Sequence, residues 1–269
     1  MRLAKVMHFQ KFRRKTHRAA LESYGTRIYV SNAGGNTISK ISPTGTDLGI
    51  FANTGLTSPN GLAFDLAGNL YAANTGNNTI EKFSPTGTDL GVFANTGLSQ
   101  PLGLAFDSAG NLFAANQSGG TIEKFSSAGG DLGVFANTGL NSPQALAFDS
   151  AGNLYAANAG ANTIRKFSPA GTDLGDFASS GLNVPMGLAF DSAGNLYAGN
   201  LSGNTIREFS PSGTDLGSFA PTGLNGPAFL AFAPEIAVPE PSTYGVLFGL
   251  GLLGVCMANT LRRRKSAAV

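Results

Sequence analysis

A six-residue string that returns every 42 residues constrains the fold of this chain more than any other feature. The string is Pro-x-x-Leu-Ala-Phe, and its copies begin at Pro59, Pro101, Pro143, Pro185 and Pro227. Two further strings, Asn-Thr-Ile-x-x-Phe and Asp-Leu-Gly-x-Phe-Ala, keep the same spacing with small variations. A fixed period of this length predicts a repeat architecture in which each unit packs on its neighbours. Sixteen of the 19 phenylalanines fall in the repeats, which favours a core role over a ligand cage.

Each repeat reads as four short strands. In residues 61–94 these are Gly61–Phe64, Asn69–Ala73, Thr79–Phe83 and Leu90–Ala94, and turn residues bound every one of them. No window within the repeats has the apolar period of a helix. Four antiparallel strands per 42 residues are the unit of a β-propeller blade, so we expect an all-β propeller.

The two ends of the array predict how the ring closes. Arg27–Val30 aligns with the second strand of a unit, whereas Phe229–Ala233 aligns with a first strand. Joining them gives a composite first and last blade, which removes exposed sheet edges. We therefore expect five four-stranded blades within residues 25–234, with a truncated six-bladed ring as the alternative.

The repeat resembles a known family. Its consensus is Pro-x-Gly-Leu-Ala-Phe-Asp-x-x-Gly-Asn-Leu-Tyr-Ala-Ala-Asn, followed by Ile-x-Lys-Phe. This pattern is similar to NHL-type repeats, which belong with the wider gluconolactonase-like and virginiamycin-lyase-like propeller groups. The resemblance covers residues 25–234 and implies the propeller fold, while it says little about activity.

The carboxyl terminus has a different composition from the repeats. A linker over residues 235–243 contains Val238, Pro239, Glu240 and Pro241. Residues 244–261 follow with a long uncharged apolar stretch, which predicts a transmembrane helix of marginal length. The basic tail 262–269 contains Arg262, Arg263, Arg264 and Lys265, which is typical of a membrane stop on the cytoplasmic side.

This order of motif, span and basic cluster closely resembles the PEP-CTERM sorting signal of Gram-negative bacteria, over residues 237–265. The resemblance implies passage through the inner membrane and cleavage near Pro239–Pro241 by an exosortase. The body would then be released or attached in the cell envelope or outside it. The same tail is also known under an ice-binding-protein name, which describes the tail rather than a demonstrated activity.

The amino terminus lacks an evident secretory signal. Residues 1–24 contain seven Lys and Arg and no apolar run of the usual length, so we expect a disordered segment outside the propeller. Proteins with this tail carry a leader, so either the start is misassigned, the leader is lost, or the protein is not exported, and the first two alternatives are favoured. Residues 25–234 hold 7 basic and 13 acidic groups, a net charge of 7 − 13 = −6. An acidic body excludes a nucleic-acid partner, and the +2 of the whole chain comes from its two ends.

Two sets of polar residues recur at strand ends. One is a ring of asparagines that end the second strand of each blade: Asn32, Asn74, Asn116, Asn158 and Asn200. It could bind a sugar or a cation, although tight-turn capping is the stronger interpretation. The other set comprises Asp65, Asp107, Asp149 and Asp191, for which calcium binding competes with a role in hairpin turns. We expect Glu81 and Lys82, with their equivalents, to be solvated pairs on an outer strand.

The repeats contain few residues of the types that catalyse reactions. His8 and His17 precede the array, and Cys256 lies in the predicted span, so we expect no catalytic residue, metal or cofactor. The leading hypothesis is a non-enzymatic exported propeller with an interaction or scaffold role, with exopolysaccharide or surface proteins as partners. A metal-dependent lactonase-like or lyase-like enzyme is the alternative. Ice binding by an array of Thr54, Thr96 and Thr138 is a weak third, because radial placement would not give a flat face.

Overall fold

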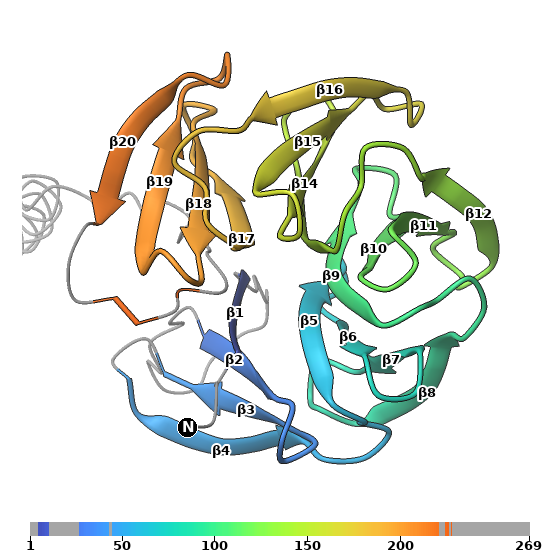
Figure 1. Cartoon of the computed structure of the whole chain (residues 1–269). Coiled ribbons are helices and arrows are strands. Elements are labelled where there is room, and N and C mark those ends of the chain that lie inside the picture. The colour runs from blue at the N-terminus through green and yellow to red at the C-terminus, as the bar shows by residue number, and fades with distance from the viewer. Residues whose placement is uncertain (1–4, 11–26, 43–44, 221–223, 226, 228–269) are drawn as a thin grey trace, which may run out of the picture. The chain divides into compact units, whose positions relative to one another are not determined.

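The structure is a computed structural model that describes residues 5–10, 27–42, 45–220, 224–225 and 227. The chain divides into two units, Met1–Ala233 and Pro234–Val269, and the second lies outside the described residues. The first unit contains five four-stranded antiparallel sheets arranged as the blades of a propeller (Figure 1). This confirms the predicted all-β architecture and blade count.

Each blade follows the order of the chain from its inner to its outer strand. Blade 1 comprises β1 (Lys5–Gln10), β2 (Arg27–Asn32), β3 (Thr37–Ile41) and β4 (Asp47–Ala52). Blade 2 comprises β5 (Pro59–Phe64), β6 (Leu70–Asn74), β7 (Thr79–Phe83) and β8 (Asp89–Ala94). Blade 3 comprises β9 (Pro101–Phe106), β10 (Leu112–Asn116), β11 (Thr121–Phe125) and β12 (Asp131–Ala136). Blade 4 comprises β13 (Pro143–Phe148), β14 (Leu154–Asn158), β15 (Thr163–Phe167) and β16 (Asp173–Ala178). Blade 5 comprises β17 (Pro185–Phe190), β18 (Leu196–Asn200), β19 (Thr205–Phe209) and β20 (Asp215–Ala220).

The first blade differs from the expectation. Its inner strand is β1, which lies within residues 1–24 and pairs antiparallel with β2 through a bulge between Val6 and His8. An inner strand is held mainly by the backbone ladder of its neighbour, so a segment outside the repeat pattern can supply it. The segment Phe229–Ala233, which we expected in this position, lies outside the described residues.

Aromatic side chains fasten one blade to the next. The ring of Tyr71 in β6 meets Phe93 of its own blade and Phe106 of blade 3 edge to face, with centroids 4.8 and 5.0 Å apart. The equivalent triplet recurs between the other consecutive blades, for example around Phe113 and Tyr155. Edge-to-face packing is the arrangement that aromatic quadrupoles favour. The phenylalanines at these blade junctions are therefore core residues, as predicted, whereas Phe219 of the last blade is 58% exposed.

The outer strands protect their own free edge. In β8 the side chain of Asp89 accepts a hydrogen bond of 2.8 Å from the amide of Gly91, which has a φ of 90°. The same bond occurs at the start of each of the other four outer strands. A capped, kinked edge discourages pairing with another strand. Among the described residues, the structure contains no helix long and apolar enough to cross a membrane; the predicted helix 244–261 lies outside them.

Candidate functional site

The asparagines that end the second strands are structural in four blades. Asn74, Asn116, Asn158 and Asn200 are at most 1% exposed. In blade 2, Asn74 Oδ1 accepts from the amide of Thr57 at 3.0 Å, and its Nδ2 donates to the carbonyl of Gly55 at 2.7 Å. Nδ2 also donates to Thr79 Oγ1 at 3.1 Å. Each amide thus joins the connection entering its blade to the third strand, a longer reach than the turn capping that the sequence suggested.

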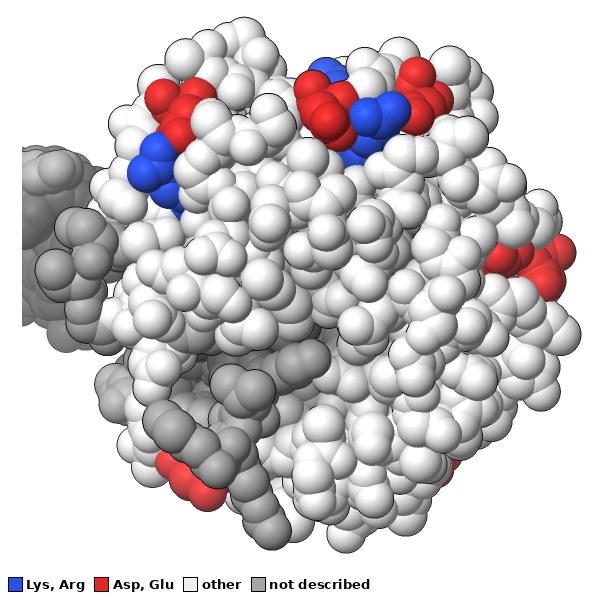
Figure 2. Space-filling view, viewed as in Figure 1, with Lys and Arg blue, Asp and Glu red and all other residues white. Residues whose placement is uncertain are grey.

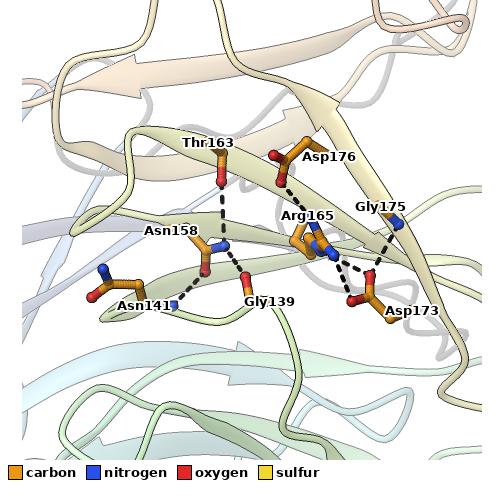
Figure 3. A network of polar contacts seen from close by, with 8 residues as sticks. All are labelled: Gly139, Asn141, Asn158, Thr163, Arg165, Asp173, Gly175 and Asp176. Atoms are coloured by element: carbon orange, nitrogen blue, oxygen red, sulfur yellow. Dashed lines mark hydrogen bonds and ion pairs between the residues drawn. The ribbon is translucent and has the colours of Figure 1, made fainter.

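Figure 3 shows this arrangement in blade 4. Asn158 donates to Gly139 O and Thr163 Oγ1 and accepts from the amide of Asn141, whose own side chain points away from the network. Asn32 in blade 1 is half-buried instead, and its Nδ2 donates to Thr37 and Ser39. The buried amides have no free donor or acceptor for a ligand, because their polar atoms bind the protein itself.

A second set of asparagines ties three of the blades to the following connection. Asn36, Asn78 and Asn162 stand in the β2–β3, β6–β7 and β14–β15 turns with φ between 51° and 56°. Their side chains accept bonds of 2.7–2.8 Å from the amides of Ser58, Gln100 and Val184, respectively. Asparagine tolerates this left-handed conformation better than other residues with a side chain. These residues recur in the repeat, but their role is not evident from one unit, because the amide that each one binds lies 22 residues later in the chain.

Blade 3 breaks this pattern. Gly120 stands in the β10–β11 turn where the other turns have asparagine, with a φ of 59°. A glycine has no side chain, so the amide of Ser142 lacks the acceptor that Ser58, Gln100 and Val184 have. Beside it lies a shallow pocket of about 340 Å³ that Gln100, Gln117 and Asn141 help to line.

The hairpin aspartates also serve the fold. Asp65 accepts from the amide and the side chain of Asn69, both at 2.8 Å, and from the hydroxyl of Tyr71 at 3.2 Å. Burial, followed by the charge of Asp65, raises the pKa of Tyr71. The aspartate–asparagine bonds recur in blades 3, 4 and 5. Within the described residues no group of three or more His, Cys, Asp or Glu could hold a metal ion.

The glutamates of blades 2 and 3 are buried rather than solvated, which corrects the expectation. Glu81 and Glu123 are each 3% exposed. The Glu81 carboxyl lies beside Asp89, and both pack under the backbone of Gly55. Burial, with help from the neighbouring aspartate, raises the pKa of Glu81 and of Glu123 to about 7. These groups therefore keep a proton where an exposed glutamate has lost it.

Blades 4 and 5 hold arginine at the same repeat position. Arg165 binds Asp173 through two bonds of 2.6 and 2.7 Å and Asp176 through one of 2.9 Å (Figure 3). These bonds hold the pKa of Asp173 below its usual value, against the effect of burial. Arg207 pairs with Asp215 through Nη2, while its buried Nε has no hydrogen-bond partner among the described residues. The same repeat position therefore holds a buried glutamate beside an aspartate in blades 2 and 3 and an arginine paired with an aspartate in blades 4 and 5.

The lysines next to these positions contact aromatic rings. Lys82, Lys124 and Lys166 place their Nζ atoms 5.0–5.1 Å from the ring centroids of Tyr71, Phe113 and Tyr155. In the view of Figure 2, charged side chains lie toward the periphery of the face and the middle of the described surface is uncharged.

Two of the three threonines proposed for ice binding have internal partners. Thr96 hydrogen-bonds Asp131 and Thr138 hydrogen-bonds Asp173, each in the following blade. The expectation that His8 lies outside the propeller is wrong, because this residue lies in β1. His17, Cys256 and the predicted sorting and membrane-stop residues lie outside the described residues.

Comparison with known proteins identifies the tail. Residues 237–265 match the family model described as the PEP-CTERM protein-sorting motif. The chain ends in a PEP-CTERM sorting signal. This signal implies export to the cell envelope or surface and processing by an exosortase-type enzyme. The match contains the predicted motif Val238–Pro241 and the basic residues Arg262–Lys265.

Solved structures show the fold of the body. A chain of a nidogen/laminin complex is 24% identical with a TM-score of 0.65, covering 72% of this chain and 76% of that one. A candidate gluconolactonase is 18% identical with a TM-score of 0.67, covering 77% of each chain. Virginiamycin B lyase from Staphylococcus aureus is 16% identical with a TM-score of 0.62, covering 81% and 71%. A search of curated proteins finds no match. The NHL-type propeller expected from the repeats agrees with these neighbours in fold.

Proposed function

We propose that this protein is a non-enzymatic propeller of the Gram-negative cell surface or matrix, with an interaction or scaffold role. It begins as a precursor held in the membrane by residues 244–261, and an exosortase cleaves it near Val238–Pro241. The observation that carries the proposal is the PEP-CTERM motif at residues 237–265, directly behind the repeats. Exopolysaccharide or surface proteins are the partners that this location offers.

The polar chemistry of the repeats supports a binding role. The ring asparagines, the hairpin aspartates and the buried glutamates all bind partners inside the protein. A propeller whose recurring polar groups hold the blades together offers its loops and faces for recognition rather than a repeated catalytic group.

Processing can be tested with tags at both ends of the chain, in a Gram-negative host with an exosortase and in a strain that lacks it. We expect the carboxyl-terminal tag to be lost only when the exosortase is present. Glu240→Ala alters the sorting motif and should retain the tag, while Glu235→Ala lies outside the match and should be processed normally. Retention of the tag by the unaltered chain in exosortase-positive cells, with the body soluble in the cytoplasm, would refute the proposal.

A second candidate is a metal-dependent lactonase-like or lyase-like enzyme. Two observations favour it: the likeness to a candidate gluconolactonase and to a lyase, and the presence of His8 in an inner strand. Addition of calcium should then raise the unfolding temperature, and gluconolactone or virginiamycin B should be consumed. A flat calcium titration together with no turnover of either compound would exclude this candidate.

A further inference from the structure

The pocket on blade 3 lies where Gly120 replaces the asparagine of the other β2–β3-type turns. It lies among three segments: the β8–β9 connection with Gln100, the β10–β11 turn with Gln117 and Ser118, and the β12–β13 connection with Asn141 and Ser142. Its volume of about 340 Å³ is within the range of small-molecule sites. A polar feature that recurs in every blade is best explained by the structure of the blade. A feature found in one blade is a better candidate for a ligand site.

The cause of the departure is one residue. At the other junctions the asparagine of the turn reaches across to the next connection and occupies the space beside it. At Gly120 this side chain is missing, and a Cβ built there would have only the carbonyl of Leu140 near it, at 3.5 Å. The space beside the connection, which an asparagine side chain occupies at the other junctions, is therefore open at Gly120.

The frame of the pocket is fixed by hydrogen bonds. The amide of Gln100 donates to Asn78 at 2.7 Å, and its carbonyl accepts from the amide of Gln117 at 3.1 Å. The hydroxyl of Ser118 donates to the side-chain oxygen of Gln100. Side chains held on a fixed frame lose less entropy when they bind a ligand.

The lining is polar and carries no formal charge. Its lining residues include the amides Gln100 and Gln117 and the hydroxyl residues Ser118 and Ser142. Asn141 also lines it, although its amide packs against Gly160 of blade 4. Amides and hydroxyls supply donors and acceptors in alternation, which is the pattern that matches a sugar hydroxyl. An ionic ligand would find no counter-charge, and the apolar side chains of a peptide would find only Leu140.

We propose that this pocket binds a neutral saccharide. The proposal deepens the function proposed above and rests on it for the setting, since a protein at the cell surface meets extracellular polysaccharide. The sugar would exchange hydrogen bonds with the amides of Gln100 and Gln117, and the absence of an aromatic residue from the lining predicts a weak, millimolar affinity per site.

The glutamines allow a direct test. The chain has four, Gln10, Gln100, Gln117 and Gln144, so selective ¹⁵N labelling of glutamine side chains gives few signals. The probes are maltohexaose, cellohexaose and laminarihexaose, added to about 10 mM to the full chain in a detergent without a sugar headgroup. We expect at least one probe to shift Gln100 and Gln117 saturably, while the buried Gln144 stays unchanged. No saturable shift with any probe would overturn the proposal.

Gly120→Asn is the decisive variant, because it restores the residue that the other turns carry and fills the pocket. It should fold like the unaltered chain and bind the active probe at least tenfold more weakly. Asn162→Gly is the matched control: it opens the next junction and should leave the glutamine shifts as they are. Equal binding by Gly120→Asn, or shifts with an extended peptide such as hexa-alanine in place of sugars, would refute the saccharide site. The titration needs no export, so its failure is distinct from a failure of processing.

Discussion

Removal of the Asn74 side chain tests whether the asparagine ring holds the blades together. Asn74 is fully buried and makes three hydrogen bonds, to Thr57 N, Gly55 O and Thr79 Oγ1. Each bond contributes about 0.5–1.5 kcal/mol net, and Asn74→Ala removes all three. We therefore expect a loss of about 3 kcal/mol in the free energy of unfolding.

The assay combines urea unfolding with hydrogen exchange of single amides. Because about 1.4 kcal/mol corresponds to a factor of ten, the amide of Thr57 should exchange about 100-fold faster in Asn74→Ala. The amide of Ser99 serves as the internal reference, since it holds the same place in blade 3 and bonds to Asn116.

Asn32→Ala is the matched control, because Asn32 is half-buried and bonds two side chains. Its cost should be about 1 kcal/mol. If Asn74→Ala unfolds at the same urea concentration as the unaltered chain and Thr57 exchanges at its original rate, the structural role of the ring is wrong, and ligand binding becomes the better explanation.

Three further predictions concern glycines and the buried acids. Gly120→Asn should stabilise the fold by about 1 kcal/mol in urea unfolding, because its side chain gives the Ser142 amide an acceptor; a loss of stability would contradict this. Gly61→Ala should cost about 3 kcal/mol, because the new Cβ would lie 1.8 Å from Leu102 O, whereas Ala145→Gly at the same repeat position should cost about 1 kcal/mol. Since the folded-state pKa of Glu81 and Glu123 is raised to about 7, the stability they provide is complete below about pH 4.5 and is lost as the pH rises through 7. The double variant with Gln at both positions should flatten that slope in unfolding measured from pH 4 to 8.

The repeat predicted the blades because each strand is short, apolar and bounded by turn residues within one unit. The predicted strand Thr79–Phe83 coincides with β7, and Leu90–Ala94 differs from β8 only by Asp89. β1 was missed because Lys5–Gln10 shares no pattern with the inner strands of the repeat, and its pairing depends on the backbone.

The partners of the polar residues could not be predicted from the sequence of a single repeat. The partners of Asn74 come from the connection that enters its blade, 17 and 19 residues earlier in the chain. Glu81 appears solvated beside Lys82 in the sequence, yet Gly55 of that connection covers it. An alignment of the repeats shows that Gly120 replaces an asparagine. Only the structure shows that the asparagine side chain at this position binds the next connection.

The most direct test of the account is where the propeller body resides. Proteinase K added to intact exosortase-positive cells, followed by detection of an epitope placed in an exposed turn of the propeller, reports which side of the envelope it occupies. We predict that the epitope is digested in intact cells, while a cytoplasmic marker survives, and that it is protected when the exosortase is absent. An epitope that stays intact until the cells are lysed would contradict the account.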